Sequence, residues 1–125
     1  MENDKFDGKG IYYYNDWDRY EGDFKKDNFD GKGIYYCNNG NLYEGDWKNG
    51  IFEGKGKMHY NNGDRYEGNW KNAKKEGKGI YYYKDGEQQM GYYSNNKPIG
   101  KHALLKNNGE IKIINFKKEK KNKNN

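Results

Sequence analysis

The sequence predicts an all-β protein: an elongated, single-layer antiparallel meander, built as a solenoid-like stack of 23-residue β-hairpins with a degenerate C-terminal cap. A Gly-Lys-Gly triplet recurs every 23 residues, aromatic residues keep the same spacing, and Asn-Gly or Asp-Gly dipeptides mark turns between the repeated segments. No segment has a sustained 3.6-residue apolar period, so no helix is expected within the array.

The glycine triplets set the register of the repeat. Intact triplets begin at Gly8, Gly31, Gly54 and Gly77, a damaged fifth copy begins at Gly100, and each start lies 23 residues after the previous one. No insertion or deletion interrupts these copies. Each 23-residue segment is therefore expected to be one structural unit that packs against its neighbours along a single axis.

Each copy contains two segments with the composition of β-strands, such as residues 42–47 and 55–60, which are rich in aromatic residues. One connecting turn is explicit, because Asn39-Gly40 and its equivalents place glycine where a positive φ is needed. The other turn, around Asn49-Gly50 and Asn72-Ala73, is expected to be looser. About ten strands at about 4.8 Å each would make a sheet roughly 50 Å long.

Alternation along a strand assigns side chains to two faces. Tyr43, Gly45 and Trp47 share one face, while Glu44 and Asp46 share the other. Bare glycine leaves room for large rings from neighbouring strands to lie over the backbone. The repeated rings are therefore expected to form an aromatic spine, which would stabilise a chain that has 14 Tyr but no Val.

The repeat has departures at both ends and in the middle. Trp17 occupies the turn-glycine position, so the first turn must differ or Trp17 must be strained. Lys57 replaces an Ile and Lys75 replaces a Phe that other copies carry. Residues 91–116 are interpreted as a degenerate terminal cap. The end of this cap is expected to be closed by Ile111, Ile113 and Ile114.

The pattern of residues 43–50, Tyr-Glu-Gly-Asp-Trp-Lys-Asn-Gly, followed by Gly54-Lys55-Gly56, resembles the MORN (membrane occupation and recognition nexus) repeat. The resemblance covers residues 6–111. It implies an elongated, twisted single sheet with a groove, which is non-catalytic and binds partner proteins or lies at membrane and cytoskeletal junctions. Lipid binding is a second implication of the resemblance.

We therefore predict a non-catalytic scaffold or adaptor whose groove binds a peptide, a helix or a coiled coil. Tyr and Trp anchor protein interfaces because they bury a large area with few rotatable bonds. The competing interpretation is that the same rings only hold the sheet together. The candidate partner-binding residues are Tyr20, Phe24, Tyr43, Trp47, Tyr66 and Trp70.

The alternative function is a peripheral membrane module that binds anionic phospholipids through rows of lysines and a basic tail. Residues 112–125 contain six Lys and one Glu, whereas residues 1–111 hold 18 basic and 18 acidic residues. The neutral body argues against nucleic-acid binding. The candidate lipid-binding residues are Lys117, Lys118, Lys120 and Lys121.

No catalytic, cofactor or metal site is predicted. His59 and His102 lie 43 residues apart, which is not a whole number of repeats, so they are not expected to share a metal. Cys37 occupies a position that is Tyr in other copies, and Ser94 is the only Ser. The repeated carboxylates, such as Glu44, are expected to pair with the lysines of the Gly-Lys-Gly triplets on a solvated face.

Residues 1–116 are predicted to form an array of about five repeats, the first partial and the last degenerate. Residues 117–125 are predicted to be a disordered tail rich in Lys and Asn. The single cysteine and the polar N-terminus favour a cytoplasmic location, with peripheral contact at a membrane or the cytoskeleton left open. Open sheet edges predict a homodimer formed through the ends or edges of the sheet.

Overall fold

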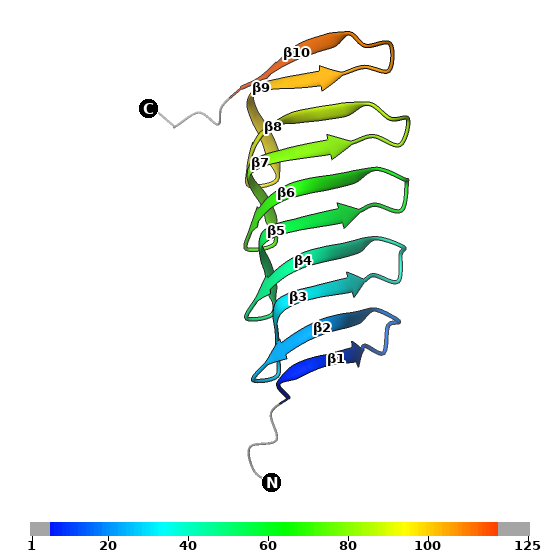
Figure 1. The fold of residues 1–125 in the computed structure, drawn as a ribbon, viewed down its shortest axis with the longest axis vertical. Coiled ribbons are helices and arrows are strands. Elements are labelled where there is room, and N and C mark those ends of the chain that lie inside the picture. The colour runs from blue at the N-terminus through cyan, green and yellow to red at the C-terminus, as the bar shows by residue number, and fades with distance from the viewer. Residues whose placement is uncertain (1–5, 118–125) are drawn as a thin grey trace, which may run out of the picture.

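The computed structural model describes residues 6–117, which form one ten-stranded antiparallel sheet (Figure 1). The strands lie side by side in chain order and the sheet is not closed, so β1 and β10 are its edges. Their bounds are β1 Gly8–Tyr13, β2 Arg19–Lys25, β3 Asn28–Tyr36, β4 Leu42–Lys48, β5 Ile51–His59, β6 Arg65–Lys71, β7 Lys74–Tyr82, β8 Gln88–Ser94, β9 Lys97–Leu105 and β10 Ile111–Phe116. The described residues contain no helix, and the predicted all-β meander is confirmed.

Two kinds of turn alternate along the stack. In the longer turns the glycine N–H bonds back across the turn, as Gly40 N–H does to Cys37 O at 3.0 Å, and Gly40 has a φ of 99°. The shorter turns have two residues, as at Asn49 and Gly50, whose φ values are 50° and 85°. The expectation of a looser turn there was wrong. Positive φ at both positions gives a tight hairpin turn that matches the twist of the strands.

Trp17 takes the place of the turn glycine without changing the turn. Its N–H donates to Tyr14 O at 3.2 Å, its φ is 79°, and its side chain is 87% exposed. Of the two outcomes that the sequence left open, the structure therefore has the strained tryptophan in an ordinary turn.

The core lies on one face of the sheet and is aromatic. Tyr20 stacks on Phe29 with ring centroids 3.7 Å apart, and Tyr20 and Trp47 form an edge-to-face pair with ring centroids 5.2 Å apart. Tyr43 and Trp70 repeat the second contact at 5.5 Å. The predicted aromatic spine is present, with a Trp ring between successive Tyr rings.

Glycine on the facing strand makes room for each tyrosine. A Cβ atom at Gly33 would overlap the ring of Tyr20, and one at Gly56 would overlap the ring of Tyr43. Tyr20 Oη donates to Asp23 O at 2.7 Å, and burial raises the pKa of Tyr20 to about 12. The glycine repeat is therefore a packing requirement of the tyrosine repeat.

The last copy keeps the fold by exchanging a large and a small residue. Gln89 stands in the tyrosine position, and His102 stands in the facing glycine position and is 1% exposed. His102 Nε2 donates to Tyr92 O at 2.9 Å, the carbonyl equivalent to Asp23 O in the first full repeat. Gln89 Nε2 donates to His102 Nδ1 at 3.0 Å. The imidazole thus fills the space and makes the hydrogen bond of the missing phenol.

The end of the array differs from the expected isoleucine closure. Ile111 and Ile113 are exposed and lie on the face opposite the aromatic core. Ile114 pairs with His102 on the core face, and the Phe116 ring lies 4.9 Å from the His102 ring. The core is therefore completed at this end by Phe116, which stands in the column of Trp47 and Trp70.

Candidate functional site

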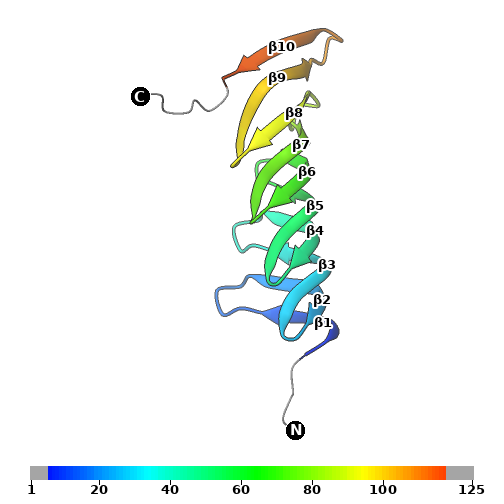
Figure 2. The same ribbon diagram turned by 90° about the vertical axis from the view of Figure 1, so that its left-hand side faces the viewer.

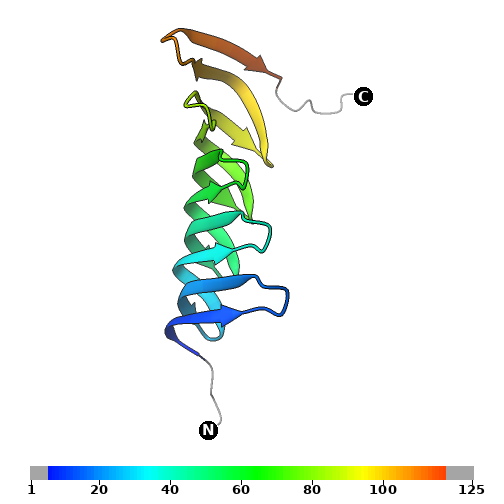
Figure 3. The ribbon, with the colours of Figure 1, turned by 90° about the vertical axis from the view of Figure 1, so that its right-hand side faces the viewer.

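The face opposite the aromatic core carries three rows of side chains that cross the strands. The stack is elongated and its strands bend along their length, as the two side views show (Figures 2 and 3). The Lys–Asp row contains Lys9, Asp23, Lys32, Asp46, Lys55, Asn69 and Lys78. The central row contains Ile11, Glu21, Ile34, Glu44, Lys57, Glu67 and Ile80. The Arg–Tyr row contains Tyr13, Arg19, Tyr36, Leu42, His59, Arg65 and Tyr82.

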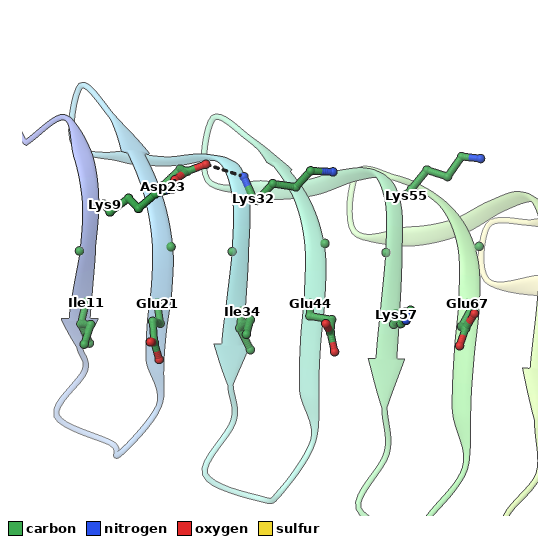
Figure 4. A pocket seen from close by; sticks show the side chains of 16 residues that line it. Lys9, Ile11, Glu21, Asp23, Lys32, Ile34, Glu44, Lys55, Lys57 and Glu67 are labelled. Atoms are coloured by element: carbon green, nitrogen blue, oxygen red, sulfur yellow. Dashed lines mark hydrogen bonds and ion pairs between the residues drawn. The ribbon is translucent and has the colours of Figure 1, made fainter.

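The Lys–Asp row and the central row line a groove of about 820 Å³ that crosses β1 to β6 (Figure 4). The backbone of paired glycines lies between the two rows and forms the floor; these are Gly10, Gly22, Gly33, Gly45, Gly56 and Gly68. At Gly22 the strands approach so closely that a Cβ atom would overlap Gly33 Cα. Glycine at the same level of both strands therefore permits the close approach of the two backbones at the floor of the groove.

The Lys–Asp row is held by ion pairs in its first half. Lys9 Nζ lies 2.6 Å from Asp23 Oδ1, and Lys32 Nζ pairs with Asp46. Asp23 also accepts a hydrogen bond from Lys32 N–H at 3.0 Å. The hydrogen bond from Lys9, together with that from Lys32 N–H, lowers the pKa of the Asp23 carboxyl. The expected pairing of these lysines with the repeated Glu was wrong, because Asp lies directly across the strand pair.

The glutamates of the central row pair instead with the Arg–Tyr row. Arg65 Nε donates to Glu67 Oε2 at 2.6 Å, and the Arg65 guanidinium lies 3.8 Å from the centre of the Tyr82 ring. Glu44 Oε1 lies 3.1 Å from His59 Nε2. Each carboxylate of this row therefore has a basic neighbour on its own side of the groove. The first copy repeats the arrangement with Arg19, Glu21 and Tyr36.

The six candidate partner-binding aromatics do not line the groove. All are between 0% and 8% exposed and pack together on the core face; they are Tyr20, Phe24, Tyr43, Trp47, Tyr66 and Trp70. In the folded chain they hold the sheet together and offer little surface to a partner. The apolar side chains that line the groove are Ile11, which is 50% exposed, and Ile34, which is half-buried. Alternation along the strands could have predicted these two residues, because they lie on the face opposite the buried rings.

The candidate lipid-binding lysines are described only in part. Lys117 follows β10 and is exposed. Lys118, Lys120 and Lys121, together with the rest of the segment predicted to be a disordered tail, lie outside the described residues. The structure therefore places one of the four candidates, at the C-terminal end of the sheet.

The chemistry of the site consists of ion pairs and apolar contacts. Residues 6–117 contain no group of three or more His, Cys, Asp or Glu side chains arranged to hold a metal ion. Within the same residues no helix is long and apolar enough to cross a membrane. Cys37 is half-buried, and burial raises the pKa of its thiol, which opposes formation of a nucleophilic thiolate.

Comparison with known families matches the MORN repeat to residues 1–19, 20–42, 43–65 and 66–88. The second, third and fourth matches begin at the buried tyrosines Tyr20, Tyr43 and Tyr66, so the matched unit and the structural unit have the same period. No similar curated protein was found. Since the matched segments cover well over half of the sequence, the chain belongs to the MORN-repeat family.

Proposed function

We propose that the chain is a non-catalytic scaffold or adaptor that binds a protein segment in the groove of its MORN-repeat sheet. The groove is the observation that supports this proposal. It is about 820 Å³, it crosses six strands, and its lining combines a bare backbone floor with exposed or half-buried Ile, Glu and Lys side chains. Such a long open depression suits an elongated occupant better than a small molecule, which binds in enclosed pockets.

The spacing of the groove residues suits a helix or a coiled-coil strand. Ile11 and Ile34 are one repeat apart, which is two strand spacings, or about 9.6 Å. At about 1.5 Å per residue, a helix that lies along the groove advances by roughly 6.4 residues per repeat. Apolar side chains at heptad spacing therefore meet successive isoleucines with little drift.

Groove variants test the proposal. Ile11→Lys and Ile34→Lys place a cation in the central row, where Lys57 is already tolerated, so we expect the sheet to fold with an unchanged circular dichroism spectrum. Partners identified by affinity purification of the native chain, and then purified, are expected to bind these variants at least about tenfold more weakly, about 1.4 kcal/mol.

Ile51→Lys is the matched control, because Ile51 is exposed but does not line the groove. Binding by this variant is expected to equal that of the native chain. Equal binding of every partner by the two groove variants would show that the groove is not the site. Alanine at Tyr43 or Trp70 is unsuitable for this test, because loss of a buried ring destabilises the sheet itself.

The membrane alternative proposes that rows of lysines and the tail bind anionic phospholipid. Lys55 and Lys78 support it, because Asn69 and Tyr92 stand opposite them in place of the aspartates. Lys9 and Lys32 weaken it, because each pairs with an aspartate. Flotation with phosphatidylserine vesicles that is lost at high salt, or on deletion of residues 117–125, would favour this alternative over the protein-binding function.

A further inference from the structure

The central row changes chemistry at one point. Lys57 stands in the column that holds Ile11, Ile34 and Ile80 in the other repeats, and it is exposed in the groove lining. In Figure 4 it lies in line with the two isoleucines that precede it. A segment that packs apolar side chains on Ile11 and Ile34 meets a cation one repeat further on.

The Lys–Asp row changes at the same strand. Lys55 is two residues before Lys57 on β5, so both side chains are on the groove face. Asn69 lies directly opposite Lys55, where Asp23 and Asp46 lie opposite the lysines of the earlier copies. Within residues 6–117 no ion pair is formed by Lys55 or Lys57.

The carboxylates around Lys57 and Lys55 already have basic partners. Glu44 and Glu67 flank Lys57 on the neighbouring strands, but Glu44 lies 3.1 Å from His59 and Glu67 lies 2.6 Å from Arg65. Asp46 accepts a hydrogen bond from Lys55 N–H at 3.2 Å, while its ion pair is with Lys32. Lys55 and Lys57 are therefore the charged residues of the groove lining that form no ion pair within the described part of the chain.

The summed charge of the three rows reverses between the two halves of the array. The three rows over β1 to β4 hold three cations and four carboxylates, a net charge of −1; these are Lys9, Arg19 and Lys32 against Glu21, Asp23, Glu44 and Asp46. Over β5 to β7 they hold four cations and one carboxylate, a net charge of +3; these are Lys55, Lys57, Arg65 and Lys78 against Glu67.

We propose that the protein segment bound in the groove carries an Asp or Glu side chain that contacts Lys55 and Lys57, and that this contact sets the register of the segment. The inference rests on the proposed function. A strictly repeated apolar column would let a heptad-spaced segment shift by one repeat at little cost. With Lys57 in the column, only one register places apolar side chains on Ile11 and Ile34 and a carboxylate on the two lysines. A shift by one repeat would press the carboxylate against an isoleucine without its cations, which is unfavourable.

The test is a selection from a displayed library of amphipathic helices of about 21 residues, with apolar residues fixed at heptad spacing and the other positions random. Binders selected on the native chain are expected to share an Asp or Glu at one position about a heptad beyond two apolar residues. Binders selected on Lys57→Ile are expected to be apolar at that position. This variant restores the residue of the other repeats, so its fold is expected to be intact.

Binding of a selected peptide, measured by fluorescence anisotropy, then gives the coupling energy between its carboxylate and Lys57. Changing its carboxylate to the amide is expected to weaken binding to the native chain about tenfold, and to Lys57→Ile less than about twofold. Lys48→Gln is the charge-matched control, because Lys48 is exposed and does not line the groove; it should keep the tenfold effect.

Three results would overturn the inference, and they separate it from the proposed function. Selected binders without a shared carboxylate would show that no carboxylate contact sets the register. A carboxylate effect that persists in Lys57→Ile would show the same for the contact with Lys57. The groove function would stand in both cases if Ile34→Lys abolished binding. A library that yields no binder sensitive to Ile34→Lys would count against the groove function and the register contact together.

Discussion

Tyr20, Tyr43 and Tyr66 each lie over a glycine of the next strand, and the tyrosine and the glycine work as a pair. The glycine cannot gain a Cβ atom while the ring is present, as at Gly79 and Tyr66. In the last copy both members change together, to Gln89 and His102, and the contact is preserved. A residue that looks degenerate in one column is thus compensated in another.

This pairing predicts strong coupling between Tyr66→Gln and Gly79→His. Tyr66→Gln alone leaves a cavity and Gly79→His alone overpacks the ring, so each is expected to destabilise the fold by about 2 to 4 kcal/mol. The double variant reproduces the Gln89 and His102 arrangement and is expected to recover about 2 kcal/mol in urea unfolding. Tyr43→Gln combined with Gly79→His, which are not partners, should be additive. Additivity of the first pair as well would contradict the exchange.

The strain at Trp17 gives a second prediction. Its φ of 79° is unfavourable for a bulky side chain, and the ring is 87% exposed, so little packing is lost on removal. Trp17→Gly is expected to raise the free energy of unfolding by about 1 kcal/mol, measured as a higher Tm. Gly40→Trp, the reciprocal change in the next repeat, should lower it by a similar amount. A lower Tm for Trp17→Gly would mean that the ring makes stabilising contacts.

Neighbouring strands are linked across the groove face by ion pairs that differ between copies. The first two copies have Asp23 and Asp46 in the Lys–Asp row, and the third has Asn69. The groove of this chain is therefore neither uniform nor symmetric, although its strand pairs share the same register.

These pairs predict an acid-dependent loss of stability. The hydrogen bond from Lys9 lowers the pKa of Asp23 in the folded chain. Stability from such a group is present above its unfolded pKa of about 3.9 and is lost as the pH falls through the lower folded value. Because Lys9 and Asp23 are both solvent-accessible, each pair should contribute less than about 1 kcal/mol.

Urea unfolding between about pH 5 and pH 3 measures this loss. Asp23→Asn with Asp46→Asn is expected to flatten the pH dependence, and added salt should do the same in the native chain. Asn69 shows that an amide is compatible with the position. An unchanged slope in the double variant would assign the acid sensitivity to other carboxyl groups.

The two ends of the array differ in what they can pair with. Ile114 of β10 stands in the column of Gly22, Gly45 and Gly68, where a Cβ atom would overlap the facing strand. A further repeat therefore cannot pair with β10 in the manner of the others. Among residues 6–117, nothing equivalent obstructs the β1 edge, and Tyr12 and Tyr13 of that strand are exposed.

Because only the β1 end of the described sheet can accept another strand in this way, the predicted self-association should use that end. We expect a closed dimer through two β1 edges, rather than a growing polymer, with a mass that light scattering resolves at tens of micromolar. Tyr12→Lys, a charge on an open edge, should return the chain to a monomer. Lys112 stands in the column of Tyr20, Tyr43 and Tyr66, so Ile114→Gly with Lys112→Tyr should instead open the other end and permit longer assemblies. A native chain that is monomeric under these conditions would contradict the prediction.

Much of this architecture was determined by the sequence alone. The period, the turn glycines and the alternation of Tyr43 with Glu44 depend on local backbone preferences, and these predicted the ten strands, their order and the two faces. Only the tertiary structure decided which face is open to a partner. Alternation separates the faces, but the bending of the strands and the nesting of rings over glycine bury one and leave the other as a groove. The exchange of Gln89 and His102 also needed three dimensions, since residues 13 apart meet only when their strands pair.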